Sequence, residues 1–158
     1  MLWKSFIGKS INDTVEAYNF FSPCIACHLL MHIARIKLSR HFRSTNVISG
    51  EREMHSDREK INQLPFVLDF YNELFNSAGI THHTPIRHIR SNKDITEIVS
   101  KYGISAIKLD CLFSGTYYDQ EGKILFDKHR LSDYVRKYIA DRLIDLPDKI
   151  VLKCSSIS

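Results

Sequence analysis

The chain has 158 residues, of which 44% are hydrophobic and 25% charged. This length and apolar content suit one domain that buries its own core, and the sparse Pro and Gly argue against wholesale disorder. We expect residues 1 to 149 to form a single α/β domain carrying a cysteine site, and residues 150 to 158 to form a flexible tail.

No apolar stretch approaches the roughly 18 to 20 residues that a membrane-spanning helix needs. The segment Met1 to Asn12 also lacks the apolar core of a signal peptide, so we expect a cytoplasmic protein without a membrane partner. The formal net charge of +4 is compatible with RNA binding, but it is equally common in proteins that never contact nucleic acid.

The first predicted element is a helix that runs from Cys27 to Phe42 and is entered directly from the cysteines. Most of its apolar residues recur at helical spacing: Leu29, Leu30, Ile33, Ile36 and Leu38. The pattern leaves His32, Arg35 and Arg40 for a polar face. The next segment, Thr45 to Ser49, predicts a short buried strand that ends at Gly50.

Local signals place three further helices and two strands. One helix begins at Pro65 and ends before Gly79, a second follows Ser91 with Asp94 in capping-box spacing, and a third begins at Ser132 and stops near Pro147. Residues 80 to 86 and 104 to 109 predict strands. This alternation favours an α/β fold with a Rossmann-like layered parallel sheet.

Cys24 and Cys27 form a CxxC motif, which in a reducing compartment indicates metal binding or redox chemistry. A helix that begins near Cys27 would lower the pKa of both thiols through its dipole. Cys111 is the natural third ligand, because it follows a predicted strand and precedes the Gly115 turn. Cys154 lies in the tail and is the weaker candidate for a fourth ligand.

Three cysteines with one open position match a [4Fe–4S] cluster better than a structural zinc site, which normally takes four ligands. His28 could complete a Cys₃His zinc site, so zinc remains the alternative metal. A CxxC pair taken alone is also compatible with packed thiols or a redox pair.

The charged turn from Gly50 to Asp57 is the second candidate site, because α/β folds place ligands just after buried strands. The candidate catalytic residues are Glu51, Arg52 and His55, and the candidate nucleotide-binding residues are Gly50, Arg52, Glu53 and Asp57. Gly50 would let the backbone approach a nucleotide, Arg52 would pair with phosphate, and the carboxylates would help hold Mg²⁺. The alternative is an ordinary solvated loop.

The basic residues outside this turn could form a phosphate-binding face or could be solvated surface charges. A phosphate-binding face would use Arg35, Lys37, Arg40, Arg43, Arg87, His88 and Arg90. The ordinary interpretation is solvated helix and loop charge.

Taken in order, these motifs resemble the latter part of the tRNA 2-thiocytidine-forming enzymes, a branch of the PP-loop ATP pyrophosphatases. The resemblance covers about Ser22 to Gly115. It is carried by Cys24-x-x-Cys27, the basic helix, Val47-Ile-Ser-Gly50, Pro85-Ile-Arg87, Lys93-Asp94-Ile95 and Cys111-Leu-Phe-Ser-Gly115. In that family two cysteines open a helix, an I-x-x-G-H turn follows, and a C-x-x-C-G turn closes the site.

The resemblance implies that Cys24, Cys27 and Cys111 hold a [4Fe–4S] cluster, and that the protein uses ATP and Mg²⁺ to thiolate a base in tRNA. The family's glycine-rich phosphate loop is not found here, so we expect an incomplete domain, with a homodimer or an N-terminal partner supplying that loop. Gly50-Glu-Arg-Glu-Met-His55 stands where the family has Gly-His-x-x-Asp-Asp. The alternative function is a non-catalytic, zinc-stabilised module that binds nucleic acid or protein.

Overall fold

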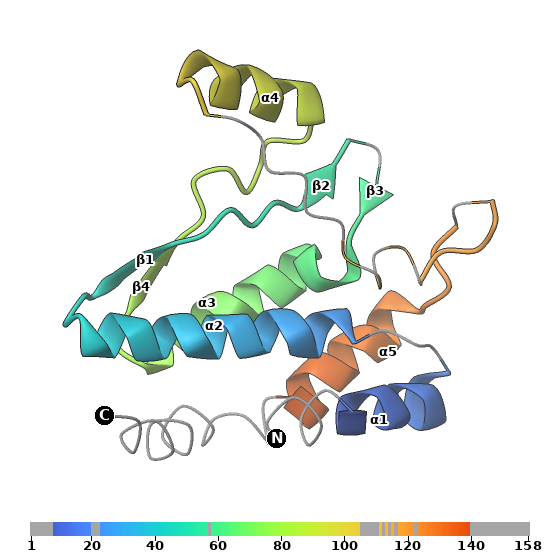
Figure 1. Cartoon of the computed structure of the whole chain (residues 1–158). Helices are drawn as coiled ribbons and strands as arrows, with labels where there is room; N and C mark the ends of the chain where they lie inside the picture. Colours follow the sequence, from blue (N-terminus) through green and yellow to red (C-terminus); the bar gives the residue numbers. More distant parts are fainter. Residues whose placement is uncertain are drawn as a thin grey trace.

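The computed structural model describes residues 8–19, 23–56, 58–104, 111, 113, 115, 117–121 and 123–139. Its α-helices are α1 (Lys9–Tyr18), α2 (Cys24–His41), α3 (Pro65–Ser77), α4 (Asn92–Lys101) and α5 (Lys128–Asp133). The short strands are β1 (Asn46–Ile48), β2 (Met54–His55), β3 (Arg58–Glu59) and β4 (Thr81–His83). A 3₁₀ turn, η2 (Ile61–Gln63), precedes α3, and a π-helix, η3 (Tyr134–Ile139), continues α5 (Figure 1).

Two parallel strands align the segments on which the candidate site is built. β1 pairs with β4, with Val47 opposite His82, and the connection between them contains β2, β3, η2 and α3. Beyond the strands the backbone pairing continues from Glu53 N to Arg87 O at 3.0 Å and from Ser56 N to Arg90 O at 2.8 Å. The charged turn is therefore held along the segment that follows β4.

Helices α2 and α3 pack against each other and against the two-stranded sheet (Figure 1). Their buried apolar side chains form the core: Ile25, Leu29, Ile33 and Ile36 from α2, and Val67, Leu68, Tyr71, Leu74 and Phe75 from α3. η3 also contacts α3, and it adds Tyr134 and Val135 to this core. The apolar stripes of the sequence thus define the face that each helix buries.

The helix predicted from Cys27 to Phe42 is confirmed, but it begins one turn earlier than expected. Pro23 occupies the N-cap, and its carbonyl accepts a hydrogen bond from Cys27 N at 2.9 Å. Both cysteines therefore lie inside the first turn of α2.

The predicted helices after Pro65 and Ser91 are confirmed. Gly79, at φ +72°, follows α3, and Ile80 N bonds back to Phe75 O at 3.0 Å. Such a positive φ favours glycine and ends the helix. The Ser91 hydroxyl accepts from Lys93 N and Asp94 N at the start of α4, as the capping signal predicts.

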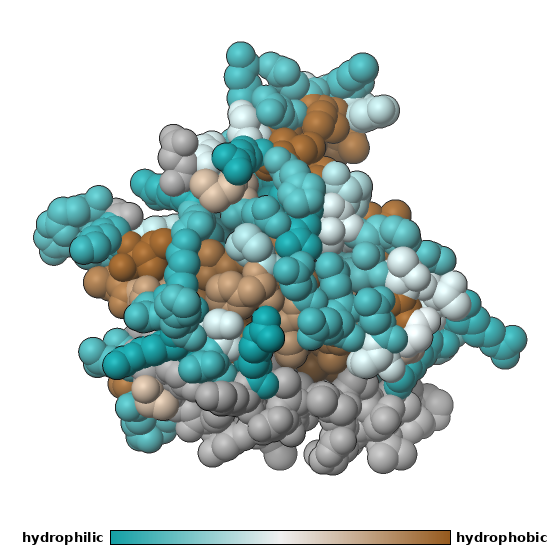
Figure 2. Space-filling model, turned by 180° about the vertical axis from the view of Figure 1, so that it is seen from behind, coloured by the Kyte–Doolittle hydropathy of each residue, from teal (hydrophilic) through white to brown (hydrophobic). Residues whose placement is uncertain are grey.

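Helix α4 stands away from the core, and none of its residues is buried (Figure 1). Ile98 and Tyr102 near its C-terminal end are 43% and 73% exposed. In Figure 2 hydrophobic surface gathers at the end of the molecule that α4 occupies. The amphipathic pattern of this helix is thus not explained by burial within the described residues.

The described residues form a mixed helix and strand fold with a small parallel sheet, which agrees with the coarse α/β prediction. Among them the parallel sheet has two strands, so a full Rossmann-like layer is not seen there. The helix predicted from Ser132 is confirmed as far as Ile139, within α5 and η3. Its remainder, the strand predicted at 104 to 109 beyond residue 104, and the tail at 150 to 158 lie outside the described ranges. Helix α1 was not predicted. No described helix is long and apolar enough to cross a membrane.

Replacing Leu29 by alanine should lower the free energy of unfolding by about 2–5 kcal/mol, because this α2 side chain is fully buried. Leu38→Ala makes the same change in the same helix at a side chain that is 54% exposed, and should change the free energy by about 0.5 kcal/mol or less. Urea denaturation of both variants measures the difference. Equal effects would contradict the described packing of α2.

Candidate functional site

A buried carboxylate lies at the centre of the candidate site. Glu51 follows β1 and Gly50, and it is only 4% exposed. Arg52, the next residue, is 6% exposed. The interpretation of this turn as a solvated loop is therefore wrong at these two positions. A Cβ on Gly50 would make only ordinary contact, with Ile86 Cδ1 at 3.8 Å, so packing does not require glycine here.

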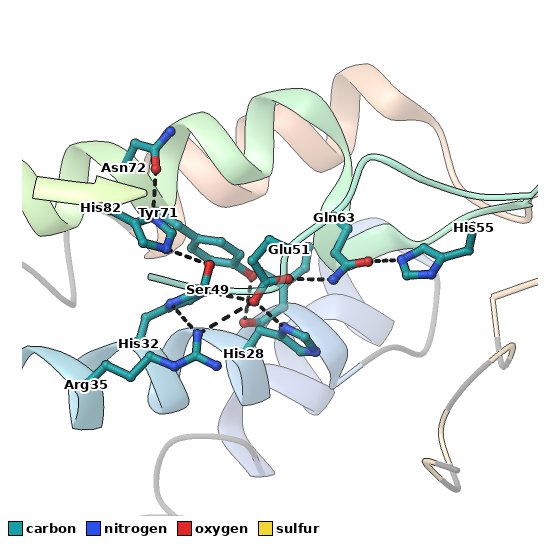
Figure 3. Close-up of polar contacts among 11 residues, drawn as sticks. His28, His32, Arg35, Ser49, Glu51, His55, Gln63, Tyr71, Asn72 and His82 are labelled. Atoms are coloured by element: carbon teal, nitrogen blue, oxygen red, sulfur yellow. Dashed lines mark hydrogen bonds and ion pairs between the residues drawn. The ribbon is translucent and has the colours of Figure 1, made fainter. Parts of the chain in front are cut away.

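A chain of hydrogen bonds connects Glu51 through Gln63 to His55, one of the other predicted catalytic residues (Figure 3). The Gln63 amide donates to Glu51 Oε2, and the Gln63 carbonyl oxygen pairs with His55 Nε2. Arg52 Nη2 donates to His55 Nδ1 at 2.8 Å and to Asn92 Oδ1 at 2.5 Å. Glu51, Arg52 and His55 therefore lie in one connected network, which is linked through Asn92 to α4.

Three side chains from α2 converge on the other oxygen of the carboxylate, Glu51 Oε1 (Figure 3). The distances to Oε1 are 3.6 Å from His28 Nδ1, 3.5 Å from His32 Nε2 and 3.7 Å from Arg35 Nη1. These separations exceed a good hydrogen bond, so the attraction is mainly electrostatic. The two oxygens of Glu51 therefore have different environments.

His32 was expected on a polar face of the helix, and that prediction is wrong. Its ring is fully buried, 4.4 Å from the Tyr71 ring and 5.4 Å from the Phe75 ring. The aromatic side chains of α3 fill the space that the sequence pattern assigned to solvent. Arg35, one helical turn further, is 36% exposed at its side chain and does reach the surface.

Burial and the neighbouring polar groups have opposite effects on the pKa values of His32, His55 and Glu51. Burial lowers the pKa of His32 to about 3, although Glu51 acts against this. Burial also lowers the pKa of His55 to about 4, with Gln63 opposing it. For Glu51 burial favours the protonated form, but His28 and Gln63 stabilise the carboxylate and hold its pKa at about 2. Near neutral pH Glu51 is therefore an anion, and the His32 and His55 imidazoles are neutral.

The three predicted cysteine ligands differ in burial, since Cys24 is buried, Cys27 is partly buried and Cys111 is exposed. Burial raises the pKa of Cys27, and Cys111 raises it further, so these two thiols lie within electrostatic reach. The predicted lowering of the Cys27 pKa by the helix dipole is wrong, because burial and a second thiol dominate. Cys24 Sγ also lies 3.8 Å from Phe113 O.

Lys60 connects the cysteines electrostatically with the Glu51 network. Burial lowers the pKa of Lys60, as does the nearby Arg52 guanidinium. The groups that act in the opposite direction are Glu51, Cys24 and Cys111. Among the described residues, His28, His32 and Glu51 form the group whose metal-ligating atoms all lie within 4.8 Å of one another. The cysteine site thus stays a prediction.

Other predicted residues are arranged differently from expectation. Glu53 and Asp69 pair with Arg87 at 2.7 and 2.8 Å. Arg87 is thus an internal ion-pair partner and is not available for a phosphate-binding face. Arg40, Arg43, His88 and Arg90 are exposed. Asp57 and Cys154 lie outside the described residues.

Sequence reasoning missed the role of His32, and it considered Gln63 only as a possible extension of the site without assigning it a role. Residues four apart lie on the same helix face, so the spacing of His28 and His32 was a usable signal. No local pattern indicated Gln63, because its partner Glu51 is 12 residues away and approaches only through the fold.

Comparison with known proteins identifies one similar protein. The chain is 33% identical over 146 residues to Uncharacterized protein MJ0009 of Methanocaldococcus jannaschii. The alignment covers 92% of this chain and 52% of that protein, so the chain spans about half the length of the curated relative it matches. No family model matches the chain, and no solved structure matches it.

Arg87→Gln should lower the free energy of unfolding by about 1.5–3 kcal/mol, because it removes charge-assisted bonds to Glu53 and Asp69. Arg90→Gln is the matched control at an exposed position, and should change that energy by about 0.5 kcal/mol or less. Thermal and urea denaturation measure both. An Arg87 variant as stable as the Arg90 variant would contradict the internal role of Arg87.

Proposed function

We propose that the chain takes part in ATP-dependent sulfur transfer, or related PP-loop adenylation chemistry, on a nucleic-acid base. Cys24, Cys27 and Cys111 would hold a [4Fe–4S] cluster. The observation that carries the proposal is that Cys111, 84 positions further along the chain, lies near enough to Cys27 to raise the pKa of its thiol. The resemblance to tRNA 2-thiocytidine-forming enzymes supports the same assignment.

The predicted cysteine ligands suit a positively charged metal ion or cluster. Two thiolates close together repel each other, which is why Cys111 raises the pKa of Cys27. Binding of iron or another cation would relieve that repulsion and keep the thiols ionised. When bound, the cluster would supply the sulfide that becomes attached to the base.

The residues around Glu51 would act on the nucleotide and the base. Lys60 interacts electrostatically with Glu51, Cys24 and Cys111, and its ammonium group would attract an anionic group of the substrate. The Arg52 guanidinium is already bonded to His55, Asn92 and the Ser91 carbonyl. We therefore assign Arg52 a positioning role, in which it fixes His55 and the start of α4 against the turn.

The carbonyl oxygen of the base would attack the α-phosphate of ATP and release pyrophosphate, and sulfide attack on the base carbon would then release AMP. Phosphate binding of this kind needs converging backbone N–H groups, which the family's glycine-rich loop provides. We propose that an N-terminal partner, a second copy or preceding sequence supplies that loop. The described α/β segment would then be part of a larger Rossmann-like layer.

Anaerobic purification tests the cluster directly. The as-purified chain should be brown and contain iron and acid-labile sulfide, because thiolate-to-iron charge transfer absorbs visible light. Cys27→Ala and Cys111→Ala should each abolish iron loading, whereas Cys154→Ala should retain it. Iron retained in the Cys111 variant would contradict the three-cysteine site, and a colourless protein with stoichiometric zinc would support a zinc-stabilised module.

The chain on its own should bind ATP weakly, because side-chain charge seldom replaces a backbone phosphate loop. Isothermal titration calorimetry with ATP and Mg²⁺ should show no saturable micromolar binding. Adding a polypeptide that carries the phosphate loop should produce binding that Lys60→Met weakens, with Lys101→Met on exposed α4 as the control. Micromolar binding by the chain alone, insensitive to Lys60, would place the nucleotide elsewhere.

A further inference from the structure

We propose that His28, His32 and Glu51 bind a divalent transition-metal ion of the Zn²⁺ or Fe²⁺ class, at a site separate from the cysteines. The donor atoms come from one face of α2 and from the turn after β1, and all lie within 4.8 Å of one another. The proposal does not depend on the cluster or on sulfur transfer. It rests on spacing, burial and unsatisfied ligand atoms.

The distances fit a metal better than they fit hydrogen bonds. With metal–ligand bonds of about 2.1 Å, neighbouring donors of a tetrahedral site lie roughly 3.4 Å apart. Glu51 Oε1 lies 3.6 Å from His28 Nδ1 and 3.5 Å from His32 Nε2. Only a small adjustment would therefore be needed to place an ion between them.

Two of the three donor atoms are buried without a hydrogen-bond partner, namely His28 Nδ1 and His32 Nε2. Buried polar atoms in folded proteins are almost always paired, so two orphaned atoms facing the same carboxylate need an explanation. His32 is fully buried, so surface water cannot easily satisfy it. A bound metal would satisfy both nitrogens at once.

The sequence spacing supports the same ligand set. His28 and His32 are four residues apart, as are the two zinc-binding histidines of the HExxH helix. The glutamate that serves as general base in that motif is replaced by Leu29, which is fully buried. The site thus has the ligand spacing of a zinc helix but lacks the acid–base residue of those metalloproteases.

The second oxygen of Glu51 is already fixed. Gln63 donates to Oε2, which leaves Oε1 facing the two imidazoles. Such outer bonds orient a ligating carboxylate and raise metal affinity. Two imidazoles and one carboxylate suit Zn²⁺ or Fe²⁺, whereas Mg²⁺ and Ca²⁺ prefer oxygen ligands alone. Three protein ligands would leave at least one position for water or substrate.

Arg35 competes with a metal in two ways. Its guanidinium lies 3.7 Å from Glu51 Oε1, where it offsets the charge that would attract the ion. It also lies 3.1 Å from His32 Nδ1. Arginine can only donate hydrogen bonds, so in this contact His32 Nδ1 is the acceptor and the imidazole proton is on Nε2. Nε2 is the nitrogen that would have to bind the metal. Metal binding would therefore require Arg35 to turn toward solvent, which its 36% exposure allows.

Cobalt titration of the metal-free chain tests the site. We would use the 158-residue chain carrying Cys24→Ser, Cys27→Ser and Cys111→Ser, so that none of the three predicted cysteine ligands can bind the probe. Co²⁺ should give visible d–d bands without the near-ultraviolet thiolate charge-transfer band, and Zn²⁺ should displace it. His28→Ala should weaken Co²⁺ binding by at least about tenfold, as loss of a direct ligand requires.

The Arg35→Ala variant should bind Co²⁺ more tightly. Misfolding would weaken binding, so a gain in affinity cannot be caused by misfolding. Removing this competing charge should tighten Co²⁺ binding on the order of tenfold. Arg40→Ala removes the same charge from an exposed position on the same helix and should leave the affinity unchanged. Equal affinities in these two variants, or undiminished binding in His28→Ala, would overturn the proposal. If the cysteine variants lose iron but still bind Co²⁺, the metal site at Glu51 is distinct from the cysteine site.

Discussion

The buried negative charge of Glu51 is the constraint on which the arrangement of the site depends. A carboxylate that is 4% exposed must be compensated by neighbouring groups, because desolvation of an uncompensated charge is costly. The compensation comes from Gln63 in η2 on one oxygen and from three residues of α2 on the other: His28, His32 and Arg35. One side chain thus connects the segment after β1 to α2 and to η2, the 3₁₀ turn that precedes α3.

The sequence predicted those parts of the fold that local chemistry determines. Pro65, Gly79 and Ser91 marked the ends of α3 and α4, and these signals act within a few residues of themselves. The burial of His32 could not be predicted in this way, because it depends on Tyr71 and Phe75 from another helix. For the same reason the turn at Glu51 could not be assigned as buried or solvated until its partners were known.

The candidate site was predicted in its residue types but only partly in its arrangement. Glu51, Arg52 and His55 were chosen because they follow a strand predicted to be buried. That strand forms as β1, but it is not buried, since Ile48 is 73% exposed. The three residues do share a network. The three-cysteine site stays a prediction, whereas the expected lowering of the Cys27 pKa by the helix dipole is wrong, because burial and Cys111 raise that pKa. Because Cys24, His28 and His32 recur every four residues, α2 presents thiol and imidazole ligands along a single face.

The central claim is that the Glu51 carboxylate and two imidazoles of α2 form a metal centre. Anomalous difference maps, recorded on either side of the zinc absorption edge from crystals grown with zinc, test it most directly. We expect a zinc peak bounded by His28 Nδ1, His32 Nε2 and Glu51 Oε1, with Arg35 turned away from the carboxylate. No peak at that position, with Arg35 still against Glu51, would contradict the account.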